Sequence, residues 1–97
     1  MDQLERGEKM IIKNITVKNA SGIHARPATL IVKEVSKFQS DITFIKGEHE
    51  VNAKSIMGLM AMAAKQGEEI EIKVEGPDEK EALTAIINLF ESNFSEE

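Results

Sequence analysis

The sequence GEEIEIKVEG, residues 67–76, carries the clearest strand signal in this chain. Its apolar residues alternate with charged residues. This alternation places Ile70, Ile72 and Val74 on one face of a strand and exposes the other, polar face to solvent. After Gly76 the period changes to three and four residues, because a helix follows with the apolar residues Leu83, Ile86, Ile87, Phe90 and Phe94. Asp78 is its predicted N-cap, with Glu81 in capping-box register.

The segments upstream repeat this combination of strand and helix. From Met10, the sequence MIIKNITVK predicts a half-buried strand with three inward residues, Ile11, Ile15 and Val17. Residues 19–22 are a predicted loop. An amphipathic helix is then predicted over residues 25–38, with its apolar stripe at Ala28, Ile31, Val32, Val35 and Phe38. Because proline is tolerated only in the first turn, Pro27 predicts a helix start at about His24 or Ala25.

The middle of the chain predicts a hairpin and a short helix. DITFIK, residues 41–46, turns Ile42 and Phe44 inward, Gly47 lies in the turn, and the second arm surrounds Val51. A brief helix after Ser55 ends before Gly67. The element order is therefore βαββαβα. We predict an α+β fold, a two-layer open-faced sandwich whose four-stranded antiparallel sheet carries three helices on one face.

Composition limits the classes of protein that this chain can be. Its 97 residues, of which 41% are hydrophobic, suit one domain and exclude a two-domain enzyme. Seventeen acidic residues against twelve basic ones argue against direct binding of nucleic acid. The chain has no cysteine, which excludes disulfides and thiolate metal sites. No apolar run approaches a signal or membrane-spanning segment, so we expect a cytoplasmic protein without membrane insertion.

The first nine residues, MDQLERGEK, are charged and have no apolar period. We predict that residues 1–9 are a disordered N-terminal extension and that residues 10–97 form the domain. Arg6-Gly7-Glu8 can be encoded by a purine run typical of a ribosome-binding site upstream of Met10. We therefore expect translation to start at Met10, and intact mass spectrometry from native cells would test this.

The segment GIHARPA, residues 22–28, combines a histidine, an arginine and a helix start. The imidazole of His24 is nucleophilic near neutral pH and can accept a phosphoryl group and surrender it again. The N-terminal end of a helix favours a dianion, and Arg26 offers a cation to the phosphoryl oxygens. In the alternative, His24 caps the helix and Arg26 is solvated, although a cation at this helix end is mildly unfavourable. His49, between Glu48 and Glu50, is predicted to be a solvated residue of the hairpin turn.

A second segment, NAKSIMGLMAMAA over residues 52–64, is apolar almost throughout after Ser55. Ser55 is the predicted N-cap of the short helix, at a position that would tolerate a phosphate. A domain of this size rarely surrounds a helix on all sides, so Ile56, Met57 and Met60 are candidates for partner contact. Leu59, Met62 and Ala63 would then face the core. The alternative, that all of these residues are buried, is equally compatible with the periodicity.

These two segments resemble the signature regions of HPr, the histidine-containing phosphocarrier family of the phosphoenolpyruvate-dependent sugar phosphotransferase system. The resemblance runs from about Met10 to Phe94 in register. It implies that His24 takes a phosphoryl group on Nδ1 from phosphorylated enzyme I and passes it to enzyme IIA domains, while Arg26 orients the group. It implies no cofactor and no metal. The predicted partner-contact surface comprises Ala25, Thr29, Ile56, Met57 and Met60.

The wording SIMGLM resembles the Gram-positive form of the family. This implies that HPr kinase/phosphorylase modifies Ser55 and that the modified protein binds catabolite control protein A in catabolite repression. Two other functions remain open: a purely regulatory HPr-like corepressor that acts through Ser55, and a small ligand-sensing domain with an incidental histidine. The presence of His24 favours the carrier, because the regulatory paralogue lacks the active histidine. We expect a monomer, since a shuttle must expose one face to several partners.

Overall fold

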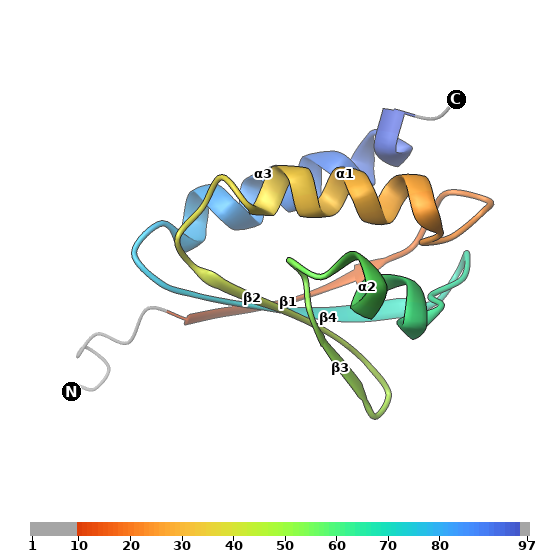
Figure 1. The fold of residues 1–97 in the computed structure, drawn as a ribbon, viewed down its shortest axis with the longest axis horizontal. Helices are drawn as coiled ribbons and strands as arrows, with labels where there is room; N and C mark the ends of the chain where they lie inside the picture. The colour runs from red at the N-terminus through yellow and green to blue at the C-terminus, as the bar shows by residue number, and fades with distance from the viewer. Residues whose placement is uncertain (1–9, 96–97) are drawn as a thin grey trace.

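The computed structural model describes residues 10–95 and contains the predicted elements in the predicted order (Figure 1). The strands are β1 (Met10–Thr16), β2 (Asp41–Lys46), β3 (His49–Asn52) and β4 (Glu69–Glu75). The helices are α1 (Ala25–Val35), α2 (Ile56–Met62) and α3 (Glu79–Glu91), and a 3-10 turn, η1 (Asn93–Ser95), follows α3. The predicted extension at residues 1–9 lies outside the described residues.

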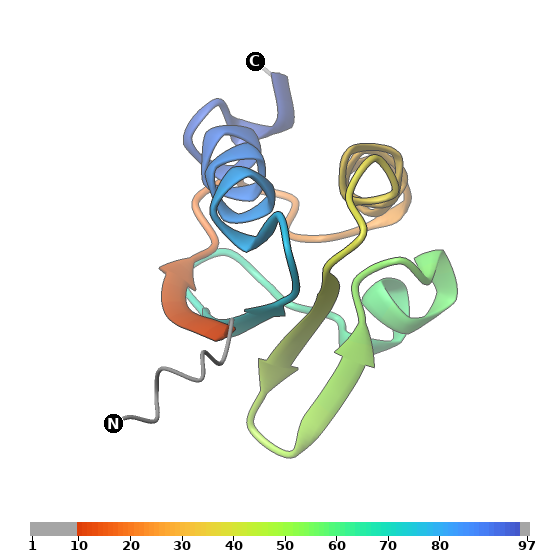
Figure 2. The same ribbon diagram turned by 90° about the vertical axis from the view of Figure 1, so that its left-hand side faces the viewer.

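The strands form one antiparallel sheet in the order β1-β4-β2-β3. The strand predicted most clearly from the sequence, β4, lies between β1 and β2, and Val74 pairs with Ile11 on one side and with Ile42 on the other. All three helices cover the same face of the sheet, and α1 and α3 lie side by side over it (Figure 2). The predicted open-faced sandwich is therefore confirmed.

The core fills the space between the sheet and the helices, as the alternating pattern of β4 requires. Ile70, Ile72 and Val74 are fully buried, as is Phe44 on the neighbouring strand β2. The ring of Phe90 lies 6.2 Å from that of Phe44 and 4.8 Å from that of Phe94, measured between centroids. Truncating one of these large buried side chains would cost about 3–5 kcal/mol.

Both long helices are shorter than predicted. Helix α1 ends at Val35, where the N–H of Ser36 donates to Val32, and Phe38 packs half-buried against the core beyond the helix. Helix α3 ends at Glu91, so Phe94 belongs to η1, with a φ of +59°, and is still fully buried. The spacing of apolar residues indicates which side chains are buried. Here buried side chains continue beyond the last helical hydrogen bond.

The prediction for Asp78 is right in its position and wrong in its hydrogen bonds. Asp78 occupies the N-cap position of α3, but its side chain makes no capping bond to that helix. Its carboxylate instead accepts hydrogen bonds from the hydroxyl and N–H of Ser40 and from the N–H of Gln39. These bonds lower the pKa of Asp78 below its ordinary value. The bond from the Ser40 hydroxyl contributes most, and the bond from the Gln39 N–H comes next. Asp78 thus ties the start of α3 to the start of β2.

Candidate functional site

His24 lies at the N-cap position of α1, at the end of the loop that follows β1. The residue is exposed and its backbone is extended, with a φ of −110° and a ψ of −157°. Its carbonyl oxygen accepts the N–H of Ala28 at 2.9 Å, which closes the first helical turn. Its imidazole makes no capping bond to α1, so the alternative in which His24 serves as a side-chain cap does not hold.

The first turn of α1 presents a positive environment next to His24. The N–H groups of Ala25 and Arg26 have no acceptor within a helix that starts at Ala25, and Pro27 has no N–H at all. The helix dipole adds partial positive charge at the same end. This turn contains no acidic residue, so nothing within it opposes an incoming anion.

The loop before His24 is held by backbone contacts on both sides of Gly22. The side-chain N–H of Asn19 donates to the carbonyl of Gly22 at 2.7 Å, and the N–H of Gly22 donates back to Asn19 at 3.1 Å. The next N–H, that of Ile23, donates to the carbonyl of Ala64 at 2.9 Å. Gly22 has a φ of +69°, and a Cβ at this position would collide with the same Ala64 oxygen. Only glycine permits this close approach.

Asn19 is therefore a positioning residue that the sequence pattern did not single out. It is 4% exposed, although residues 19–22 were expected only to form a loop. An available signal was the spacing of an asparagine three residues before a glycine, because asparagine side chains commonly bond to backbone groups nearby in turns.

Arg26, Ala25 and Thr29 are all exposed on the first turns of α1. No carboxylate among residues 10–95 pairs with Arg26, so its guanidinium is available to an external anion. The hydroxyl of Thr29 donates to the carbonyl of Ala25 at 2.8 Å. The hydroxyl hydrogen of Thr29 is therefore already used within α1.

The two segments that build this site contain no acidic residue, although the chain as a whole has a net charge of −5. Residues 17–33 and 51–67 carry only cations among their charged residues: Lys18, Arg26, Lys33, Lys54 and Lys65. Two of the five cations lie on α1 and the other three lie in separate loops, so they do not form the dense stripe that nucleic acid requires. The net charge of the whole chain does not show this separation of cations from anions. It appears only when charged residues are counted segment by segment. These two segments therefore differ in charge from the acidic remainder of the chain.

Ser55 occupies the N-cap of α2, as predicted. Its hydroxyl oxygen accepts the N–H of Gly58 at 3.0 Å, and its carbonyl accepts the N–H of Leu59. A Cβ added at Gly58 would be tightly packed, because it would lie 3.3 Å from the Val51 side chain and 3.2 Å from the Ser55 hydroxyl oxygen. The Ser55 hydroxyl therefore has a structural role in starting α2.

Helix α2 exposes the three residues predicted to contact partners. Ile56 is 39% exposed, Met57 81% and Met60 43%, so the alternative in which the whole helix is buried is wrong. We call these three residues the α2 patch. Leu59 and Met62 face the core as predicted. Ala63 does not, because the chain enters a left-handed conformation there and Ala64 takes the buried position instead.

Hydrogen bonds fix the end of α2 beside the His24 loop. The Ala64 carbonyl accepts from Ile23, and the ammonium group of Lys46 donates to the Ala63 carbonyl at 3.3 Å. Lys46 also pairs with Glu68 at 3.2 Å. Two hydrogen bonds to Glu68 lower the pKa of its carboxyl group. The bond from the N–H of Lys65 has the larger effect, and the bond from the side chain of Lys46 has the next largest. The end of α2 is thus held next to the loop that carries His24.

His49 belongs to the hairpin of β2 and β3 rather than to α1 or α2. It is exposed as predicted, but it is the first residue of β3, paired with Lys46, rather than part of the turn. The hairpin turn is correspondingly short and consists of Gly47 and Glu48.

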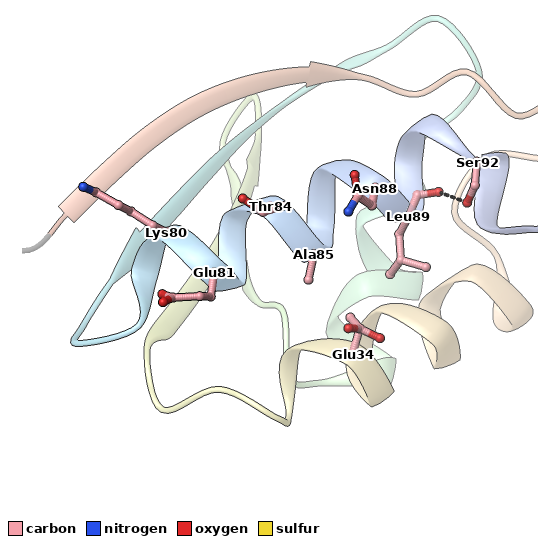
Figure 3. Close-up of a pocket in the computed structure, with 8 residues that line it drawn as sticks. All are labelled: Glu34, Lys80, Glu81, Thr84, Ala85, Asn88, Leu89 and Ser92. Atoms are coloured by element: carbon pink, nitrogen blue, oxygen red, sulfur yellow. Dashed lines mark hydrogen bonds between the residues drawn. The ribbon is translucent and has the colours of Figure 1, made fainter.

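A groove of about 700 Å³ lies between α1 and α3 (Figure 3). Leu89 and Ala85 of α3 point toward α1, where Glu34 is the residue that lines the groove. The groove shares no residue with the predicted site. Within residues 10–95, no group of three His, Asp or Glu side chains is arranged to bind a metal ion. No helix in that part of the chain is long and apolar enough to cross a bilayer.

Comparison with known proteins places this chain in a family. The family model described as PTS HPr component phosphorylation site matches residues 11–92. The chain belongs to the HPr family. HPr proteins are phosphocarriers of the phosphotransferase system, that is, carriers of a group rather than catalysts. The matched range includes both His24 and Ser55.

Individual HPr relatives cover nearly the same residues. The phosphocarrier protein HPr of Treponema pallidum is 54% identical over 88 residues, which span 91% of this chain and 100% of that protein. The HPr-like protein Crh of Halalkalibacterium halodurans is 46% identical over 82 residues, 84% of this chain and 98% of that protein. A solved structure, HPr-C-His from Thermoanaerobacter tengcongensis, has a TM-score of 0.86 at 47% identity and covers 90% of this chain and 98% of its own.

Proposed function

We propose that this chain carries a phosphoryl group on Nδ1 of His24, accepting it from phosphorylated enzyme I and passing it to enzyme IIA domains. The observation that carries the proposal is the placement of His24: exposed, at the start of an eleven-residue helix, with an imidazole that makes no capping bond to it. A group that must be taken up and surrendered needs such access from outside.

The transfer follows from the residues around His24. The Nδ1 lone pair attacks phosphorus in line, a nitrogen–phosphorus bond forms, and the bond from phosphorus to the donor breaks. The phosphoryl oxygens then face the N–H groups of Ala25 and Arg26 and the Arg26 guanidinium. These contacts are modest, which suits a carrier because the second transfer breaks the same nitrogen–phosphorus bond. The chain supplies the acceptor, while the partner enzymes supply the catalysis.

We propose that partners dock on the exposed residues Ala25 and Thr29 and on the α2 patch. Apolar side chains supply contact area, and the neighbouring cations of residues 17–33 and 51–67 favour acidic partner surfaces. One surface that serves two partners in turn must be vacated between transfers. We therefore propose a monomer, located in the cytoplasm where the partner enzymes would meet it.

A second proposal concerns Ser55, which adjoins the α2 patch. We propose that HPr kinase/phosphorylase phosphorylates its hydroxyl and that catabolite control protein A recognises the product. A dianion beside the patch would repel an acidic partner and attract a basic one. A purely regulatory corepressor would need only Ser55. The exposed His24 and its anion-favouring helix start favour the carrier.

Phosphoenolpyruvate and catalytic enzyme I test the carrier proposal directly. We expect uptake of an acid-labile phosphate by the unmodified chain and by His49→Ala, and none by His24→Ala. His49→Ala is a matched control, because it removes an exposed imidazole on another element. Uptake that survives His24→Ala would overturn the assignment, and no uptake by the unmodified chain would overturn the function.

A further inference from the structure

Helix α2 contains three methionines whose exposure differs sharply. Met57 is 81% exposed and Met60 is 43% exposed, whereas Met62, two residues further on, is 1% exposed. The chain has no cysteine, so thioethers are the only side-chain sulfur it offers to an oxidant. Exposed thioethers are oxidised to sulfoxides, whereas buried ones are protected by the surrounding core.

We propose that Met57 and Met60 form a reversible oxidation site that weakens partner docking. The proposal rests on the proposed function, because it takes the α2 patch as the docking surface. The oxidant is a hydroperoxide such as hydrogen peroxide. One peroxide oxygen is transferred to sulfur, so a sulfur–oxygen bond forms and the oxygen–oxygen bond breaks. The thioether loses two electrons, and the peroxide is reduced to water.

The effect on docking follows from the composition of the helix. Residues 56–62 read IMGLMAM and contain no polar side chain. A sulfoxide places a strong hydrogen-bond acceptor in this apolar surface, where docking would bury it against partner groups selected to contact a thioether. Burying an acceptor without a donor opposes association, so oxidation should lower the affinity for partners.

The body of the domain should be unaffected, because oxidation is confined to exposed side chains. Met62 packs in the core together with Leu59 and is out of reach while α2 remains folded. Met10 provides a second internal reference: it is 46% exposed, about as much as Met60, but lies in β1 at the start of the described chain. Its oxidation would leave the α2 patch intact.

The test treats the isolated carrier with graded hydrogen peroxide, removes the peroxide, and then adds enzyme I and phosphoenolpyruvate. Peptide mass spectrometry should find one added oxygen on Met57 and Met60 well before Met62. The kcat/KM for carrier phosphorylation should fall about tenfold relative to the untreated carrier. Methionine sulfoxide reductases should restore it, which also shows that the fold survived.

Variants show whether oxidation of the α2 patch, rather than of another methionine, causes this fall. The quantity compared is the ratio of kcat/KM after peroxide treatment to kcat/KM before it. The ratio should remain near one in Met57→Leu/Met60→Leu, because leucine is apolar and does not react with peroxide. It should remain about one-tenth in Met10→Leu. An unchanged rate with both sulfoxides present, or an equal fall in the double variant, would overturn the proposal. An untreated carrier that takes up no phosphate would instead overturn the proposed function, and this inference with it.

Discussion

Helices α1 and α2 start in different ways, although each begins at a residue proposed to receive phosphate. At α1, the backbone of His24 closes the first turn and the imidazole makes no capping bond to the helix. At α2, the hydroxyl of Ser55 accepts the N–H of Gly58 and is part of the helix start. The imidazole proposed to carry phosphate therefore contributes no capping bond to its helix, whereas the hydroxyl proposed to be regulatory does.

Gly22→Ala should break the first helix start with the largest effect. An alanine would need a left-handed backbone, and its Cβ would collide with the Ala64 carbonyl, so we expect a loss of about 3 kcal/mol in the free energy of unfolding. Gly47→Ala is the matched control, with a φ of +61° but nothing within 4 Å of the added Cβ, and should cost about 1 kcal/mol. Urea unfolding measures both, and equal losses would contradict the proposed close approach.

Arg26→Ala should separate charge from structure at the same helix start. We expect the rate of phosphoryl transfer from enzyme I to fall roughly 100-fold, because a donor to the phosphoryl oxygens is lost. Stability should stay constant or rise slightly, since a cation at this helix end is unfavourable by about 0.3–1 kcal/mol. Lys80→Ala removes an exposed cation from α3, outside residues 17–33 and 51–67, and should leave the rate unchanged. Stopped-flow transfer assays would refute the role of Arg26 if both variants behaved alike.

Ser55→Ala addresses the second helix start. Loss of the bond to Gly58 should lower the free energy of unfolding by about 1 kcal/mol, while Ser55→Asp should retain most of it because aspartate also caps helices well. Labelling by the kinase should disappear in Ser55→Ala, and phosphorylation of His24 should persist. Thermal unfolding with both labelling assays checks this, and an alanine variant of unchanged stability would show that the hydroxyl contributes nothing to α2.

The start of α3 shows a third arrangement, in which the Asp78 carboxylate accepts hydrogen bonds from Ser40 and Gln39 rather than from its own helix. Substituting Asp78 is expected to have the smallest effect of these changes. Hydrogen bonds from Ser40 and Gln39 lower the pKa of Asp78 in the folded state. The carboxylate therefore contributes stability above its unfolded pKa, and this is lost as the pH falls below about 4. Asp78→Asn should flatten the fall in unfolding free energy over this acid range, and Ser40→Ala should flatten it similarly. An unchanged acid slope in both variants would contradict the pairing.

The sequence predicted the elements well because each has one buried face, and burial leaves a period in the residue pattern. The alternation in residues 69–75 identified β4, and Pro27 located the start of α1. Helix ends were less accurate, because Phe38 and Phe94 are buried but not helical. Periodicity reports which side chains are covered, and it does not report where backbone hydrogen bonds end.

Contacts between distant residues could not be predicted in this way. The sequence around Asp78 favours a local cap, but the donors it accepts from are 38 and 39 residues away. The bond from Ile23 to Ala64 likewise joins segments that are separate in sequence. The sequence therefore identified His24, Arg26 and Ser55 as candidates, and the structure was needed to show that the loop before His24 is bonded to the end of α2.

Locating the phosphate on the wild-type chain tests the central claim most directly. After incubation with enzyme I and phosphoenolpyruvate, ³¹P NMR of the intact protein and mass spectrometry of its peptides at alkaline pH would identify the modified atom and residue. The account predicts one acid-labile phosphoryl group per chain, on Nδ1 of His24, with His49 and Ser55 unmodified. Phosphate on His49 or on a hydroxyl, or no incorporation at all, would contradict it.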